Sequence, residues 1–247
     1  MKIAIIGDPH GDIQKVKEMQ LEGTGAIILN GDLGKCDIAR KQKFSNLDRI
    51  AKGLPEVVYS TKEREEAFLE SYETAISLSK YLCSIAPTYT IYGNVENIHS
   101  KEKTGELSTE IGKRLPLLEE ELHRIGCTVF NNRPLELGGK RIGGLEYFID
   151  SPENEERAKK ILDSFGKVDV LITHQPPHNS LDRLSNPYLP KELIGKHAGS
   201  KAIREYIENM QPAQVFCGHI HEGEGIDRIG KTDVYNLGFC GYKVIEL

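Results

Sequence analysis

Short apolar runs that end at glycine or another turn-forming residue recur along the chain. Residues 2–6 and 26–29 are such runs, rich in isoleucine, and each predicts a buried strand. Between them, residues 13–21 have apolar positions at helical spacing, with Asp12 placed to cap the helix. Strand, helix and strand in succession predict the beginning of a parallel α/β sheet.

The stretch from 37 to about 125 is expected to be largely helical. Apolar residues recur every three or four positions from Thr61 to Ala86, and Ser60 with Glu63 forms a possible capping box. A strand is predicted at 88–92. Residues 97–110 are polar and predict a surface connection, and a helix at 108–125 would be interrupted at Pro116.

The second half of the chain alternates strands and helices. Strands are expected near 127–131, 135–137, 141–148, 168–173 and 213–217, helices at 154–165 and 200–209, and a long loop at 178–198. The C-terminal stretch predicts a meander with a turn near residue 230. The simplest arrangement is one α/β domain of residues 1–247, with a largely helical insertion at about 37–125.

Composition narrows the functional classes. The 247 residues are 38% hydrophobic with a net charge of −5, which argues against bulk binding to nucleic acid or anionic lipid. No apolar run approaches the ~20 residues of a membrane span, and the first run is too short for a secretory signal. The five cysteines are scattered without a CxxC pair, as is typical of reduced thiols. We therefore expect a cytoplasmic protein.

Residues with metal-binding side chains follow five of the predicted strands. They occur in Asp8-Pro9-His10, Gly31-Asp32, Gly93-Asn94, His174, and Gly218-His219-Ile220-His221. Ligands of open α/β sheets bind beyond the carboxyl ends of the strands, so these separated residues are expected to meet in one cleft. Apart from the more specific pair His219 and His221, each short motif alone is more often a turn or an ordinary buried histidine. It is their combination that indicates a site.

The combined donor set comprises two carboxylates, one amide oxygen and four imidazoles. This mixture suits Mn²⁺, Fe, Zn²⁺, Co²⁺ or Ni²⁺ and does not suit Ca²⁺. Seven ligands are too many for one ion but sufficient for two, if one carboxylate bridges them. Two cations about 3.5–4 Å apart can activate a bridging hydroxide and hold the oxygens of a phosphate.

The ordered motifs resemble those of the calcineurin-like metallophosphoesterase family, whose pattern is D-x-H, G-D, G-N-H-D/E, H and G-H-x-H. The resemblance extends from residue 3 to about residue 240 and leaves only the insertion unexplained. It implies two mixed β-sheets packed face to face and flanked by helices, with the C-terminal meander in the second sheet. It also implies that Asp8, His10 and His221 bind one metal, that Asn94, His174 and His219 bind the other, and that Asp32 bridges them.

The chain departs from the family pattern at one position. The residue after Asn94 is Val95, where the family usually has a histidine that acts as general acid or binds phosphate. Glu96, which would normally orient that histidine, is left without an evident role. His178 and His99 are candidate substitutes in catalysis, although solvated loop histidines would look the same in the sequence.

The motifs predict a dinuclear, metal-dependent hydrolase of phosphodiesters or activated phosphomonoesters, with a metal-bridging hydroxide as nucleophile. We expect two divalent ions, Mn²⁺ first among them, a small phosphate ester or nucleotide as substrate, and no membrane partner. A homodimer is possible through the insertion. Two alternatives stay open: a non-catalytic scaffold that retains the fold, and a nuclease, against which the acidic composition and the absence of Trp weigh.

Overall fold

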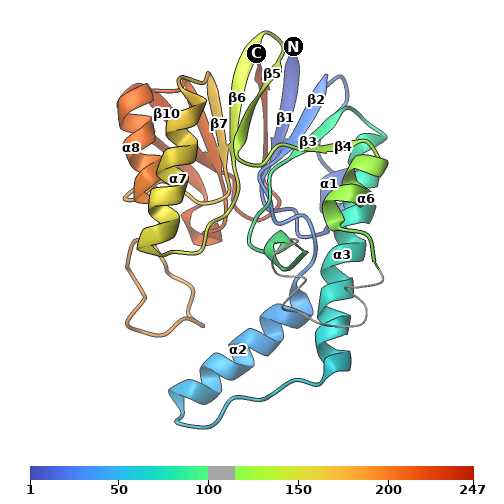
Figure 1. Ribbon diagram of the computed structural model, residues 1–247, viewed down its shortest axis with the longest axis vertical. Coiled ribbons are helices and arrows are strands. Elements are labelled where there is room, and N and C mark those ends of the chain that lie inside the picture. Colours follow the sequence, from blue (N-terminus) through green and yellow to red (C-terminus); the bar gives the residue numbers. More distant parts are fainter. Residues whose placement is uncertain (100–114) are drawn as a thin grey trace.

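Two mixed β-sheets form the centre of the molecule (Figure 1). The computed structural model describes residues 1–99 and 115–247. The first sheet has the strand order β11-β1-β2-β3-β4, with β1 to β4 parallel and β11 antiparallel to β1. Its strands are β1 (Lys2–Ile6), β2 (Ala26–Leu29), β3 (Thr88–Thr90), β4 (Cys127–Val129) and β11 (Tyr242–Glu246).

The second sheet has the order β5-β6-β7-β8-β10-β9. Strands β6, β7, β8 and β10 run parallel, and β5 and β9 close the two edges in antiparallel pairs. Its strands are β5 (Arg133–Leu137), β6 (Lys140–Leu145), β7 (Val170–Thr173), β8 (Gln214–Cys217), β9 (Gly225–Ile229) and β10 (Thr232–Asn236).

The central strands are apolar on both faces, and the two faces pack against different layers. In β1, Ile3 and Ile5 belong to the core between the sheets, whereas Ala4 and Ile6 face the helices. The second sheet contributes Ile172 and Phe216 to the same inter-sheet core. Successive side chains of a strand point to opposite faces, so a run without polar positions is buried on both sides. This is why the β1 and β2 runs contain no alternating polar residues.

Helices cover the outer face of each sheet and complete four layers (Figure 1). The first sheet is covered by α1 (Ile13–Lys17), α3 (Thr61–Cys83) and α6 (Leu118–Arg124), and the second by α7 (Pro152–Phe165) and α8 (Lys201–Met210). Ser60 caps α3 in a capping box with Glu63, as its sequence predicts. None of the helices in the described ranges is both long and apolar enough to cross a membrane.

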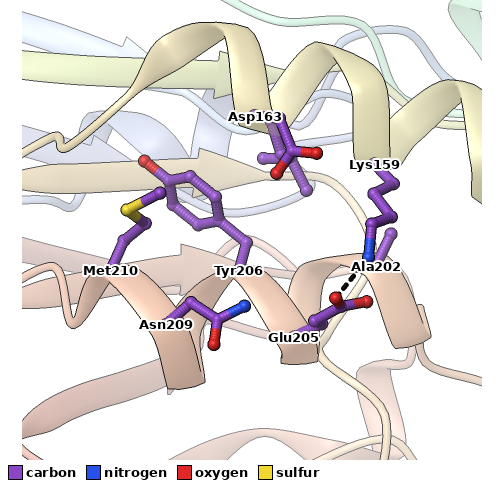
Figure 2. Close-up of a pocket in the computed structure, with 8 residues that line it drawn as sticks. Lys159, Asp163, Ala202, Glu205, Tyr206, Asn209 and Met210 are labelled. Atoms are coloured by element: carbon purple, nitrogen blue, oxygen red, sulfur yellow. Dashed lines mark hydrogen bonds and ion pairs between the residues drawn. The ribbon is translucent and has the colours of Figure 1, made fainter.

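The contact between α7 and α8 is a close helix–helix packing. Figure 2 shows Lys159 of α7 paired with Glu205 of α8, beside Tyr206 and Met210. The space enclosed there is about 10 Å³, room for about one water molecule. This crevice is therefore part of the packing and has no room for a ligand.

Helix α2 (Asp37–Ala51) differs from the others because none of its residues is buried. It is followed by a non-helical segment, residues 52–60, and together with the first half of α3 it projects from the end of the sheets (Figure 1). Two 3₁₀ helices, η1 (Glu96–His99) and η2 (His221–Gly223), follow β3 and β8.

Several expected elements differ from the observed ones. Helix α1 ends at Lys17 and not at residue 21, because the amide of Met19 bonds to the carbonyl three residues earlier and the chain turns toward β2. The helix expected at 108–125 is observed as α6 from residue 118, and residues 100–114, which include most of the polar connection, lie outside the described residues.

The C-terminal meander is divided between the two sheets. β9 and β10 form a hairpin in the second sheet, but β11 crosses to the first sheet and pairs with β1. Ile245 of β11 packs into the core between the sheets. The resemblance implied that the whole meander lies in the second sheet, which is wrong for its last strand. An alternating strand of five residues carries no signal that selects its partner.

Candidate metal centre

Five parallel strands deliver the seven donor residues to one edge of the two sheets. Asp8 and His10 follow β1, Asp32 follows β2 and Asn94 follows β3, all in the first sheet. His174 follows β7, and His219 and His221 follow β8, in the second sheet. Because the carboxyl ends of these strands meet where the sheets face each other, residues up to 213 positions apart become neighbours.

A continuous chain of short contacts links the seven side chains. Nε2 of His221 lies 2.9 Å from Asp8, and Nδ1 of His174 lies 3.7 Å from the other oxygen of that carboxylate. Asp32 lies 3.6 Å from His10 and 3.5 Å from His174.

The amide of Asn94 completes the chain. Its Oδ1 lies 3.0 Å from His174 and 2.7 Å from His219. The structure thus brings together all seven side chains that the motifs singled out.

The donor atoms fit divalent metals. Asp8, His10 and His221 offer ligand atoms within 4.8 Å of one another, and so do Asp8, Asp32 and His174. Among the described residues, Asp8 Oδ1 and His10 Nε2 are buried without a hydrogen-bond partner, which is costly unless another species satisfies them. The donor set therefore contains two candidate metal-ligand groups, which share Asp8.

Burial keeps two of the imidazoles neutral. It lowers the pKa of His10, and burial together with the charge of His174 lowers the pKa of His219 to about 4. A neutral imidazole has the free lone pair that metal ligation requires. For Asp8, burial acts to raise the pKa, but His174 and His221 outweigh it and the pKa is lowered, so this carboxylate is ionised.

Four of the seven donors have left-handed backbone conformations. The φ angles are 35° at Asp8, 40° at His10, 49° at Asp32 and 64° at His219. Such conformations cost of order 1–3 kcal/mol each in residues other than glycine and collect at functional sites. They turn the side chains back toward the sheet edge, which an extended strand continuation would not do.

Two glycines permit this close approach. A Cβ added to Gly93 would lie 2.2 Å from Oδ1 of Asp32, and one added to Gly218 would lie 2.2 Å from Oδ1 of Asp8. Any larger residue at either position would displace a carboxylate of the donor set. The G-N and G-H pairs of the motifs therefore have a steric reason.

Asn30 holds two donors in place, and the sequence analysis missed it. Its side-chain oxygen accepts the backbone N–H of Asp8 at 2.9 Å, and its carbonyl oxygen lies 3.0 Å from Nδ1 of His174. A hydrogen bond at Nδ1 orients the ring and leaves Nε2 free to bind a metal. Asn30 is fully buried. Its place directly before Gly31-Asp32 was the available signal, but it looked like an ordinary turn residue.

Glu96 has a role that differs from orienting a histidine. Oε2 accepts the backbone N–H groups of Asp32 at 2.8 Å and Gly93 at 2.9 Å, and Oε1 accepts that of Leu33 at 2.8 Å, with a longer 3.4 Å bond from Gly34. The carboxylate thus joins the turn after β2 to the turn after β3. Burial, with the charge of Asp32, raises its pKa to about 7.

The residue that replaces the family's histidine cannot transfer a proton. Val95 lines the cleft, is 6% exposed, and its backbone N–H donates to Oδ1 of Asp32 at 2.9 Å. The backbone at this position therefore supports the metal centre. The side chain offers only an apolar contact.

The two candidate substitute histidines lie elsewhere. His99 is buried beside Phe68, and its Nε2 lies 2.8 Å from the hydroxyl of Ser71. Burial lowers its pKa to about 3, so the ring is neutral at neutral pH. Neither His99 nor His178 is among the residues that line the cleft.

In the long loop, His178 is one of the residues that surround the buried carboxylate of Asp182 and form the Asp182 cluster. Its Nδ1 lies 3.7 Å from Asp182, whose other oxygen lies 2.5 Å from His197. Asp182 also accepts the backbone N–H groups of Asn179 and Gly199. This cluster fixes both ends of the loop.

The cleft itself is a cavity of about 740 Å³, within the range of small-molecule sites. His10, Asp32, Asn94, His219 and His221 form one part of its lining, and α2 and the 178–198 loop contribute another. Tyr147 packs against two of the imidazoles. The centroid of its ring lies 5.7 Å from that of His174 and 5.0 Å from that of His219. Both imidazoles are thereby confined from the side of the second sheet.

Comparison with known proteins identifies relatives of the chain. A family model described as calcineurin-like phosphoesterase matches residues 1–223. An uncharacterized protein of Methanocaldococcus jannaschii is 43% identical over 78 residues, covering 31% of this chain and 34% of the relative. The human metallophosphoesterase domain-containing protein 1 is 29% identical over 122 residues, covering 46% of this chain and 35% of the relative. The chain thus spans about a third of the length of these curated relatives.

Solved structures share the fold at low sequence identity. One crystal structure superposes with a TM-score of 0.60 at 16% identity and covers 99% of this chain and 98% of its own. Another, from Staphylococcus aureus and described as a 5′-nucleotidase, has a TM-score of 0.50 at 15% identity and covers 100% of this chain and 51% of its own. Both likenesses concern the architecture alone.

Proposed function

Because the chain belongs to the calcineurin-like phosphoesterase family, we propose that it is a dinuclear metal-dependent hydrolase of phosphodiesters or activated phosphomonoesters. The observation that carries the proposal is the contact chain among the seven donors, which come from five separate strand ends. A fold retained for another purpose would have no reason to keep this full set, with four of its members in left-handed, strained backbone positions.

We assign the two ions to two sides of Asp32. Asp8, His10 and His221 would hold the first, and Asn94, His174 and His219 the second. Asp32 is suited to bridge them because one of its oxygens faces His10 and the other faces His174. Two divalent cations, Mn²⁺ preferred, would supply Lewis-acid stabilisation of the phosphate and an acidified water as nucleophile.

The surrounding residues prepare this centre without taking part in bond breaking. Asn30 and Glu96 hold the turns that carry Asp8, Asp32 and Gly93. These hydrogen bonds would hold the proposed ligands in place, which lowers the cost of ordering them around the ions. Val95 supplies an apolar wall where a proton donor would otherwise stand.

The absence of a donor at Val95 limits the substrates. A general acid typically contributes 10²–10⁴-fold to a reaction, and that contribution matters least when the leaving group is already a weak base. We therefore propose aryl phosphodiesters, nucleotides and similar esters with weakly basic leaving groups as substrates. Alkyl phosphomonoesters should react slowly.

The test combines metal content with activity. The purified protein is loaded with Mn²⁺, its bound metal is counted by mass spectrometry, and turnover is measured with bis(p-nitrophenyl) phosphate, phosphomonoesters and cyclic nucleotides. Asp32→Asn should reduce turnover by about 10²-fold or more, since even an outer-sphere partner of a metal is worth about 10–100-fold. Asp48→Asn is the matched control, because Asp48 is 61% exposed in a surface ion pair.

Three outcomes separate the candidate functions. Two bound ions with turnover that falls in Asp32→Asn support the proposal. Two bound ions without turnover of any ester would favour a non-catalytic scaffold. Turnover of a DNA or RNA oligonucleotide in preference to small esters would favour a nuclease.

We also propose a cytoplasmic location. The five cysteines, three of them buried, are all free, as expected of a reducing compartment. Non-reducing electrophoresis of protein alkylated during cell lysis would check this, since oxidised pairs would contradict it.

A further inference from the structure

Helix α2 contributes no buried side chain to the hydrophobic core. It is fifteen residues long and none of them is buried. A helix that buries nothing needs another source of stability, and α2 has one on the side away from the cleft. Asn46 exchanges two hydrogen bonds with the backbone of Val57, and Arg49 donates to the carbonyl of Pro55 at 2.7 Å.

The other side of α2 faces the cavity of the metal centre. Arg40, Lys41, Lys43 and Phe44 all line that cavity, together with His10 and Asp32. Arg40 and Phe44 are one helical turn apart and therefore lie on the same face. The helix thus holds a set of basic and aromatic side chains beside the candidate metals.

Within residues 1–99 and 115–247, the side chains of Arg40, Lys41 and Lys43 form no ion pair and no hydrogen bond. Asp37 and Glu222 line the same cavity, so the local balance is three positive charges against two negative ones outside the metal centre. Unpaired guanidinium and ammonium groups in a concave site are suited to bind an anionic group.

Two aromatic rings from different segments, Phe44 and Tyr188, line the cavity. The ring of Phe44 lies 5.7 Å from that of Tyr188, centroid to centroid, at an interplanar angle of 46°. Tyr188 is 73% exposed, so it contributes little to the core. Its loop is held in place by the buried Asp182 cluster and projects from the same end of the sheets as α2 (Figure 1).

The cavity is far larger than a phosphate group needs. With the metal donors at one part of its lining, the rest is available for the organic part of a substrate. We propose that Arg40, Lys41 and Lys43 bind a second anionic group of the substrate, and that Phe44 and Tyr188 contact a planar ring. The substrate class is then an organic phosphate that carries both features, such as a nucleoside polyphosphate or a dinucleotide.

This inference rests on the proposed phosphoesterase function and specifies its substrate. The test measures binding, so that it does not depend on turnover. Calorimetric titration of the Mn²⁺-loaded protein uses α,β-methylene-ADP, which has a ring and two anionic groups but a non-hydrolysable bridge. Inorganic phosphate serves as a second probe, since it needs only the metal centre.

The variants remove one feature at a time. Arg40→Gln should weaken binding of α,β-methylene-ADP by about tenfold or more, the effect of a charge-assisted hydrogen bond. Tyr188→Ala should weaken it by about fivefold or more, as expected for loss of a stacking partner. Tyr188→Phe, which keeps the ring, should bind as the wild type does.

Controls separate a subsite from general damage. Lys62→Gln removes a charge that is 85% exposed in a surface ion pair and should change binding less than about twofold, within the range of exposed pairs. Phosphate affinity should stay within about twofold in every variant, because surface charges that do not touch it contribute little.

The inference is overturned if α,β-methylene-ADP binds no more tightly than phosphate. It is also overturned if Arg40→Gln and Tyr188→Ala leave its affinity unchanged, or reduce the affinity of both probes equally. Turnover of an aryl phosphodiester, measured separately, reports on the proposed function. Hydrolysis with unaffected variants would refute the subsite alone, and selective binding without hydrolysis would refute the proposed activity alone.

Discussion

Replacing Glu96 by glutamine tests whether this residue supports the backbone or serves a histidine that the chain lacks. In the structure, the carboxylate accepts three short backbone hydrogen bonds, from Asp32, Leu33 and Gly93, and one long one from Gly34. Glutamine has one oxygen instead of two. Its amide nitrogen must therefore face one pair of buried N–H donors.

The size of the expected destabilisation depends on which pair of backbone N–H groups loses its acceptor. The amide nitrogen would face the pair with the longer bond, leaving Leu33 and Gly34 N–H without an acceptor. Each unsatisfied buried donor costs about 1–3 kcal/mol, and the long bond to Gly34 belongs at the low end. Removing a buried charge beside Asp32 offsets part of this. With that offset, we expect Glu96→Gln to reduce the free energy of unfolding by about 1–3 kcal/mol.

The assay is urea unfolding of the metal-free protein at neutral pH. Glu66→Gln is the matched control, since Glu66 is 53% exposed in a surface pair and its loss should cost less than about 0.5 kcal/mol. If Glu96 only oriented a histidine at position 95, the substitution would be neutral here, because that position is valine. A Glu96→Gln protein as stable as the control would refute the assignment.

Three further predictions concern the same region. Gly93→Ala should weaken Mn²⁺ binding by about 10²-fold in calorimetric titration, because its Cβ would collide with the Asp32 carboxylate, 2.2 Å away; unchanged affinity would mean that this turn is not rigid. Val95→His should raise turnover of alkyl phosphomonoesters by about 10²-fold and flatten the dependence of rate on leaving-group pKa; no change would mean that another group already donates the proton. The folded-state pKa of His99 is about 3 against an ordinary 6.5, so the unfolded chain binds the extra proton and stability falls as the pH drops below 6.5. Relative to His99→Gln, the wild type should lose on the order of 2 kcal/mol between about pH 7 and pH 4.5 in urea unfolding of the metal-free proteins, and parallel losses would contradict this.

The sequence by itself determined the strands and the chemistry at their ends. Strands such as 2–6 and 26–29 are apolar on both faces and end in a turn, and this local pattern is enough to identify a buried parallel strand. The sequence likewise shows directly which donor residue follows each strand, as with Asp8, Asp32 and His174. Their common position follows from a general property of parallel sheets, so proximity could be inferred without a structure.

Only the tertiary structure decided the interactions between distant segments. The partner of β11, the three backbone donors that Glu96 finds in the turn after β2 and the burial of His99 against Ser71 depend on residues 28 to 244 positions apart. A sequence states which groups need a partner but not which partner they find.

Helix α2 shows the same division. The sequence predicted a largely helical stretch from 37 to about 125 but not the end of α2 at Ala51. Which face of α2 meets the cavity depends on hydrogen bonds to residues 55–63 and on a loop more than a hundred residues later. Periodicity specifies faces relative to the helix axis, whereas packing specifies the rotation about that axis. The side chains beside the metal centre are therefore a property of the assembled fold.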